Sequence, residues 1–244
     1  MHIYEGPMRI TYYDLDFRGK VKLSALLRMV HIAADVNAND LGVGHQMLAN
    51  ANMSFVLQRF GLDITRMPMY DENVIIRTWP AEITRGTFIR RGEMLDIERR
   101  PLMEWASLWV LFNINTRKIL RPSALPIELP PLGNMGTTVQ AQKIERTADF
   151  GTPFSSYCHT VRYSEVDTNM HMNNSIYGDL IGNALFATPN NTPSWRSVQI
   201  NYQGETRLGE TIEVVCHHVG TDYLIVGTAP GRTSFTALVE TAQA

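Results

Sequence analysis

The sequence has no apolar run long enough to cross a membrane. The longest run, at residues 105–112, is far shorter than the roughly 20 residues that a membrane helix requires. The first residues, MHIYEGPMRITYYD, include acidic side chains where a signal peptide needs an apolar core. We therefore expect no membrane association and a cytoplasmic location.

The sequence has few cysteines, and its positive and negative charges nearly balance. Cys158 and Cys216 are the only cysteines, and their spacing is neither that of a metal site nor that of a CxxC motif. We expect both to be reduced and to lie in strands, and we expect no metal and no cofactor.

The formal charge of −2 gives no case for nucleic-acid binding. With 244 residues, 44% of them hydrophobic, the chain can form one large domain or two small ones.

An internal repeat favours two domains. Residues 12–24 read YYDLDFRGKVKLS, and residues 163–175, which begin 151 positions later, read YSEVDTNMHMNNS. A tyrosine, an acid, an aliphatic residue, an aspartate and a serine occupy matching positions. Two copies of one structural unit explain this register.

Each copy is predicted to have one main helix followed by antiparallel strands. Apolar residues at helical spacing predict a helix in each copy, the second ending before Pro189 and Pro193. The residues of the two stripes are Leu23, Leu26, Leu27, Val30 and Ala34, then Ile176, Leu180, Ile181 and Ala184. Strands are predicted from β-branched and aromatic runs at residues 73–79, 88–97, 105–115, 198–202, 211–218, 223–228 and 234–241.

A proline-rich stretch separates the two copies. Four prolines occur between residues 121 and 150, together with glycine and threonine, which is typical of a linker. We therefore predict domains at residues 1–125 and 151–244, with a linker at residues 126–150.

Only the second copy of the repeated segment contains an imidazole and side-chain amides that could take part in catalysis. Asp16 and Asp167 correspond, but Asn169 and His171 have no counterpart in the first copy. This asymmetry favours a site in the second unit. A structural alternative stands for Asp167, because an aspartate in both copies can simply cap the turn.

These residues also carry a family resemblance. The pattern D-x-N-x-H-x-N-N, formed by Asp167, Asn169, His171, Asn173 and Asn174, resembles the active-site motif of the acyl-ACP thioesterases of bacteria and plants. The first unit contributes similar stretches, among them VIIRTWPAEITRGTFIRR and WVLFNINTRKILRP, so that nearly the whole chain is covered.

The resemblance implies a fold and an activity. The fold is α+β, a tandem hotdog repeat in which each long helix is wrapped by a curved antiparallel sheet. The activity is hydrolysis of fatty acyl-ACP to free fatty acid, with Asp167, Asn169 and His171 at catalytic positions and Glu205, in INYQGETRLGETIEV, as an assisting acid. The chain departs from plant members at Thr206, where they have a cysteine, which excludes a cysteine nucleophile at that position.

The residue types suit hydrolysis of a thioester. Histidine is the side-chain type that changes its charge near neutral pH, so His171 is the natural general base or polarising group. Asp167 can orient the imidazole, hold a water molecule or attack the carbonyl. Asn169 can orient a partner or stabilise the oxyanion. Glu205 can instead be a solvated residue before a turn.

Substrate binding is predicted in both units. Asn173 and Asn174 are candidate substrate-binding residues that can cap the second helix, and the N-terminus of that helix can also donate to the thioester oxygen; both can hold at once. The resemblance implies that the acyl chain is bound in the first unit, where its lining is predicted to include Leu27, Val30 and Trp79. Ordinary core packing is the alternative for these three residues, as it is for the further candidates Ala34, Met47 and Phe55.

Charge distribution suggests how the carrier protein docks. Residues 1–125 have a net charge of +3 and residues 126–244 a net charge of −5. Because acyl carrier protein is strongly acidic, Arg85, Arg90 and Arg91 are predicted to form its docking surface, a solvated face being the alternative.

Other functions and assemblies remain compatible with the sequence. The alternative functions are a hotdog acyl-CoA thioesterase and a non-catalytic acyl-binding or dehydratase-like protein. Both a monomer and a homodimer are compatible with an internal repeat.

Overall fold

The chain forms two compact units in the computed structural model, which describes residues 2–145, 152–187 and 194–242. Unit 1 comprises Met1–Val21 and Arg28–Ala141, and unit 2 comprises Lys22–Leu27 and Gln142–Ala244. Residues 126–141 of the predicted linker therefore belong to unit 1. Its residues 146–150, like Pro189 and Pro193, lie outside the described residues. Within the described ranges, no helix is both long and apolar enough to span a membrane.

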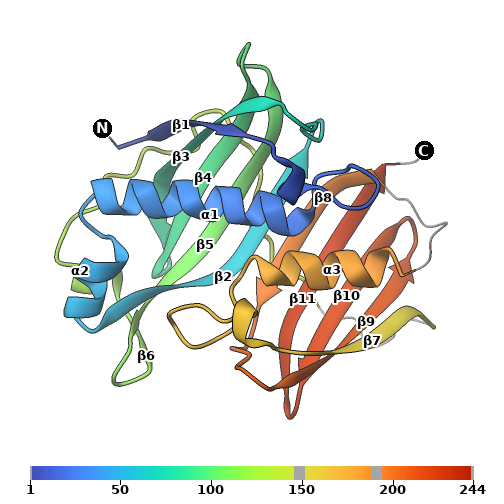
Figure 1. Ribbon diagram of the computed structural model, residues 1–244. Coiled ribbons are helices and arrows are strands. Elements are labelled where there is room, and N and C mark those ends of the chain that lie inside the picture. The colour runs from blue at the N-terminus through green and yellow to red at the C-terminus, as the bar shows by residue number, and fades with distance from the viewer. Residues whose placement is uncertain (1, 146–151, 188–193, 243–244) are drawn as a thin grey trace. The chain divides into compact units, whose positions relative to one another are not determined.

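Unit 1 is an antiparallel sheet with a helix across one face (Figure 1). The strands are ordered β1-β3-β4-β5-β2, and the short β6 pairs with β5. The elements are β1 (Tyr4–Arg9), α1 (Leu23–Asp40), α2 (His45–Asn50), β2 (Met53–Ile64), β3 (Asn73–Thr84), β4 (Thr87–Asp96), β5 (Pro101–Asn113) and β6 (Lys118–Leu120). The first residues of α1, up to Leu27, are grouped with unit 2, and the rest of the helix belongs to unit 1.

Helix α1 confirms the predicted apolar stripe. Leu26, Leu27 and Val30 are at most 2% exposed, whereas Arg28 and Asp35 on the other side of the helix are exposed. Burial of these side chains supplies the main stabilisation of an amphipathic helix. The helix α2 was not predicted.

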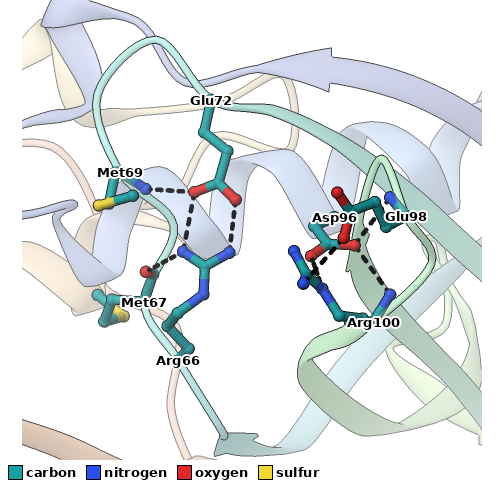
Figure 2. Close-up of polar contacts among 7 residues, drawn as sticks. All are labelled: Arg66, Met67, Met69, Glu72, Asp96, Glu98 and Arg100. Carbon is teal, nitrogen blue, oxygen red and sulfur yellow. Dashed lines mark hydrogen bonds and ion pairs between the residues drawn. The ribbon is translucent and has the colours of Figure 1, made fainter.

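Tight turns set the register of the unit 1 sheet. Arg85 and Gly86 join β3 to β4 and have φ angles of +47° and +83°, as a type I′ hairpin turn requires. Two further connections are closed by ion pairs, Arg66 with Glu72 and Arg100 with Asp96 (Figure 2). Asp96 also accepts backbone N–H bonds from Glu98 and Arg100, each 2.9 Å long.

Side chains of β3 and β4 alternate between two covered faces. On the face that meets α1, the guanidinium of Arg90 donates to Asn37 of the helix. Trp79 and Arg91, which pair with each other, point to the opposite face. There the indole of Trp79 donates to the carbonyl of Gly133 over 3.0 Å, and Arg91 donates to the carbonyl of Val139. The predicted linker therefore packs on this outer face of the sheet.

Unit 2 repeats the arrangement of a helix on an antiparallel sheet (Figure 1). Helix α3 (Ile176–Leu185) packs on β7, β9 and β10, and the strand order is β8-β11-β10-β9-β7. The strands are β7 (Pro153–Thr160), β8 (Ser194–Tyr202), β9 (Thr211–Val219), β10 (Asp222–Ala229) and β11 (Arg232–Ala242). The predicted helix and strands are confirmed. Cys158 in β7 and Cys216 in β9 are both free thiols, as expected.

Candidate active site

The candidate site is the turn that connects β7 to α3. Its ends are joined by a bridge between Val166 and Met172. Within it, the Asp167 N–H donates to the His171 carbonyl, and the Met170 N–H donates to the Asp167 carbonyl, each over 3.0 Å. Met170 has a φ of +67°, a left-handed conformation that costs a side-chain-bearing residue about 1 kcal/mol. The backbone thus holds the polar side chains on one tight turn.

The corresponding turn of unit 1 has the same backbone hydrogen bonds. The Asp16 N–H donates to the Lys20 carbonyl over 2.7 Å, and the Gly19 N–H donates to the Asp16 carbonyl over 3.0 Å. Gly19, with a φ of +74°, takes the place of Met170. The turn itself therefore requires neither the imidazole nor the side-chain amide of the unit 2 copy.

The two turns differ in what surrounds the aspartate carboxylate. In unit 1, Oδ1 of Asp16 accepts N–H bonds from Arg18 and Lys20, and Oδ2 is bound by the Arg18 guanidinium. In unit 2, Oδ1 of Asp167 accepts one bond, from the Asn169 N–H, at 2.8 Å. Among the described residues, none donates a hydrogen bond to Oδ2 of Asp167. Asp167 has the structural role that was expected of it and retains acceptor capacity.

His171 lies beside this carboxylate. Its Nδ1 is 3.9 Å from Oδ1 of Asp167, which is too long for a hydrogen bond. The side chains are 26% and 22% exposed, so solvent or substrate can reach both. The side-chain amide of Asn169, which is exposed, makes no hydrogen bond to the described part of the chain. Three groups that suit acyl transfer therefore meet on one turn.

Family models match both units of the chain. The Acyl-ACP thioesterase N-terminal domain matches residues 2–123, and the Acyl-ACP thioesterase C-terminal domain matches residues 152–235. The chain belongs to the acyl-ACP thioesterase family. Its enzymatic class is accordingly that of a thioester hydrolase.

Solved structures of low sequence identity share its fold. An acyl-ACP thioesterase from Bacteroides thetaiotaomicron is 21% identical, with a TM-score of 0.83 over 99% of this chain and 98% of that one. The 12:0-ACP thioesterase from Umbellularia californica is 16% identical, with a TM-score of 0.82 over 99% and 98% of the two chains. A protein from Lactobacillus plantarum is 22% identical, with a TM-score of 0.84 over 99% and 97%. A search of curated proteins found no match. The fold is therefore of the hotdog type.

The loop after β8 brings Glu205 next to the acyl-ACP thioesterase motif. The Met172 N–H donates to the Thr206 carbonyl over 2.7 Å. His171 directly precedes Met172 and Glu205 directly precedes Thr206, so this hydrogen bond brings the backbones of His171 and Glu205 close together. The Glu205 carbonyl accepts a 2.7 Å bond from Arg232, and its carboxylate is 3.5 Å from the Arg207 guanidinium. Glu205 thus lies beside the turn and is held by basic groups.

Thr206, which occupies the position of the plant cysteine, is a buried structural residue. It is 0% exposed, and its hydroxyl shares a 2.7 Å hydrogen bond with Ser234. Ser234 is in turn 3.3 Å from the phenol of Tyr177. These buried hydrogen bonds tie the loop after β8 to β11 and to α3.

The two asparagines at the end of the motif differ in their contacts. The side-chain oxygen of Asn173 accepts bonds from the backbone and the hydroxyl of Ser175, at 2.9 and 2.8 Å. Ser175 is the residue before α3, so the Asn173 side chain orders the turn that leads into the helix and does not itself cap an N–H group of α3. Asn174 offers its carbonyl to the phenol of Tyr202 over 3.4 Å, while its side-chain amide has no partner among the described residues. The amide of Asn174 therefore remains available to a substrate.

Sequence reasoning missed Tyr202. Burial raises the pKa of its phenol, so the group stays protonated and can donate. Its position at the end of β8, three residues before Glu205, was the available signal. Together with Asn174, it adds a polar group to the side of the turn that leads into α3.

Part of the prediction for unit 1 was wrong. Trp79 is 0% exposed but lies on the face of the sheet opposite α1, so it cannot line a space beneath that helix. Arg91 is 2% exposed, so it does not present its charge to a docking partner, whereas Arg90 is partly exposed and its guanidinium donates to Asn37. The residue 129–139 segment lies over Trp79 and Arg91 on one face of the sheet, and α1 lies on the other face. Of the three arginines, Arg85 is exposed, and Leu27 and Val30 are buried on α1.

Within the described ranges, no group of three or more His, Cys, Asp or Glu side chains is arranged to hold a metal ion.

Proposed function

We propose that the chain hydrolyses fatty acyl-ACP to free fatty acid with Asp167, Asn169, His171 and Glu205 of unit 2. The observation that carries this proposal is the difference between the two turns. The backbone bonds are the same, but the saturated carboxylate of Asp16 is replaced by an Asp167 with spare acceptor capacity and an imidazole 3.9 Å away.

His171 acts as general base in the proposed reaction. As a water oxygen attacks the thioester carbonyl carbon, the imidazole accepts one water proton. Asp167 holds the water or the imidazole through its spare oxygen. The tetrahedral intermediate then expels the carrier thiolate, which takes the proton back from the imidazolium and leaves as a thiol.

Amide donors stabilise the charge that develops on the thioester oxygen. The side chains of Asn169 and Asn174 make no hydrogen bond to the described residues, so their N–H groups need not break an existing bond to donate. Removing one such donor from an oxyanion site typically costs about 100-fold or more in kcat. Glu205 assists by fixing the water from the neighbouring loop.

The finer assignments extend the same proposal. Each unit is one hotdog repeat, and the first binds the acyl chain, with Leu27 and Val30 among the buried residues of α1. We place the protein in the cytoplasm, as a monomer or a homodimer. Docking of the acidic carrier protein uses exposed basic residues, namely Arg85 and, at the start of the unit 2 turn, Arg162.

Hydrolysis of matched substrates tests the function. Acyl-ACP and acyl-CoA of the same chain length should both be assayed, with kcat/KM higher for acyl-ACP. The variants His171→Ala and Asp167→Ala should each lose about 100-fold or more in kcat. Activity that survives both substitutions would sink the site assignment, and a preference for acyl-CoA would favour the alternative thioesterase.

A further inference from the structure

Three exposed apolar side chains flank the candidate active site. Tyr163, Met170 and Leu208 are 85%, 74% and 57% exposed. Among the described residues of unit 2, no other large apolar side chain is more than half exposed. Single exposed apolar residues are common on protein surfaces, whereas several gathered at one place mark a site of interaction.

The loop after β8 lies against both sides of the candidate turn. On one side, the Met172 N–H donates to the Thr206 carbonyl over 2.7 Å. On the other side, the Gly209 N–H donates to the Val161 carbonyl over 3.0 Å. Leu208 lies between these two bonded points of the loop, so its exposed side chain is held next to the turn.

The other two apolar residues lie on the turn itself. Tyr163 follows the bonded Val161 by two positions, and Met170 precedes the bonded Met172 by two positions. The connection from β7 to α3 and the connection from β8 to β9 lie at the same end of the unit 2 sheet (Figure 1). Tyr163, Met170 and Leu208 therefore form one apolar patch around the candidate site.

Met170 occupies its place in this patch at a cost in stability. Its backbone is left-handed, with a φ of +67°, and the unit 1 turn has Gly19 at the corresponding position. Burial of the side chain does not offset this strain, because Met170 is 74% exposed. Strained residues are concentrated at functional sites. Contact with a partner would bury the Met170 side chain.

Positive charge borders the apolar patch. Arg162 is exposed, and the side chain of Arg207 is 62% exposed. The carboxylates of the same segments are less accessible, with side chains between 18% and 32% exposed; they belong to Glu165, Asp167, Glu205 and Glu210. The most accessible charges are therefore positive, which suits an acidic partner.

Contacts within the chain occupy two of these carboxylates. Glu165 accepts the N–H of Arg162 over 2.7 Å and lies 2.9 Å from Nε2 of His159. Glu210 accepts the N–H of Arg207 over 2.8 Å and pairs with Arg232. In the described part of the chain, by contrast, no carboxylate forms an ion pair with the guanidinium of Arg162.

We propose that Tyr163, Met170 and Leu208 form the apolar centre of the docking surface for acyl carrier protein, with Arg162 and Arg207 at its rim. The thioester sulfur is attached to the carrier protein, so the carrier must approach the groups that react with the thioester carbonyl. An apolar centre with a charged rim is the usual anatomy of a protein interface. This inference rests on the proposed hydrolysis of acyl-ACP and extends the docking at Arg162 from a single charge to a surface.

Binding of a carrier protein that cannot be hydrolysed tests the proposal. The probe is acyl carrier protein whose pantetheine thiol has been alkylated to a long-chain thioether, titrated calorimetrically into the full chain. Tyr163→Ser, Met170→Gly and Leu208→Ser should each raise the dissociation constant by about fivefold to tenfold. Dissociation constants that stay at the native value in all three variants would overturn the proposal.

Two variants of unit 1 are matched controls. Tyr12 is 76% exposed and occupies the position in the unit 1 turn that corresponds to Tyr163. Met135 is 45% exposed and left-handed, with a φ of +48°, like Met170. Tyr12→Ser and Met135→Gly should leave the dissociation constant unchanged, and an equal weakening in these controls would contradict the proposed surface.

Other occupants of the patch would give different results. The same thioether on free pantetheine lacks the carrier protein and should bind the native chain and the three variants equally. If its binding weakens as well, the patch holds the pantetheine arm and the proposal is wrong. A dimer that light scattering detects in the native chain and that dissociates in Leu208→Ser would assign the patch to a second copy, which also overturns the proposal.

The proposed function can fail separately. If the alkylated carrier protein binds through the apolar patch but acyl-ACP is not hydrolysed, the docking surface stands and the hydrolysis proposal falls. If acyl-ACP is hydrolysed and the three variants bind the probe as the native chain does, hydrolysis stands and the further inference falls.

Discussion

Oδ1 of Asp167 and Nδ1 of His171 are 3.9 Å apart on a turn whose backbone is fixed by hydrogen bonds. The gap is about 1 Å longer than a charge-assisted hydrogen bond. A small shift of the imidazole, or one water molecule, closes it.

Asp167→Asn separates the structural role of this residue from its chemical role. The asparagine oxygen can still accept the Asn169 N–H, so the turn should persist and the melting temperature should change little. The loss of the negative charge should lower kcat by about 100-fold or more. Steady-state kinetics on acyl-ACP and thermal denaturation measure the two effects.

Asp16→Asn is the matched control for this prediction. Asp16 binds Arg18 through both carboxylate oxygens, so the substitution should reduce stability and leave kcat unchanged. Equal losses of kcat in the two variants would show that both aspartates are structural only.

Met170→Gly should stabilise the protein. The left-handed backbone at this position, φ +67°, favours glycine, which Gly19 provides in the unit 1 turn. The expected gain in the free energy of unfolding is about 1 kcal/mol, reduced by the greater flexibility of the unfolded chain. Urea denaturation measures it. Gly19→Ala should shift stability in the opposite direction, and a destabilised Met170→Gly would contradict the prediction.

His31 should make the protein sensitive to acid. Burial lowers the pKa of His31 to about 4 from an ordinary 6.5, so the unfolded chain binds more protons between these values. Stability should therefore fall by up to about 3 kcal/mol as the pH drops from 6.5 to 4. His31→Phe should flatten this part of the profile in urea denaturation, while His45→Gln on an exposed position should not. An unchanged slope in His31→Phe would show that another group is responsible.

Docking of the carrier protein should depend on Arg162. Arg162→Glu reverses a charge at the start of the turn and should raise KM for acyl-ACP several-fold, most strongly at low salt, with kcat nearly unchanged. Acyl-CoA of equal chain length should be less affected. The same KM measurement on Arg85→Glu tests whether the carrier protein docks near Arg85 instead. Unaltered KM values for acyl-ACP in both variants would exclude both arginines from the docking surface.

Regular elements could be predicted from the sequence because their signals are local. Apolar residues three and four apart predicted α1 and α3, and alternating β-branched residues predicted most of the strands. The turn around Asp167 was predictable because the same chain contains a second version without the imidazole. Comparison of the two copies separated the requirements of the turn from additions to it.

The predictions that went wrong concern side chains covered by distant segments. Arg91 is charged, which normally indicates an exposed position, yet the residue 129–139 segment covers it, and the partly exposed Arg90 is bonded to Asn37 of α1. Alternation along one strand puts the neighbours Arg90 and Arg91 on opposite faces of the sheet, but it does not tell which face meets the helix. Local patterns do not contain that information, since it depends on contacts between residues about 50 positions apart.

The outermost strand of unit 1 resists pairing with a second protein chain. β1 occupies the end of the strand order, and it contains Pro7, which has no N–H to donate, between the charged residues Glu5 and Arg9. Proline and alternating charges on an edge strand disfavour a further strand. Substitution of Pro7 by valine would restore a complete donor row. The strand that begins the chain therefore also limits sheet-mediated aggregation.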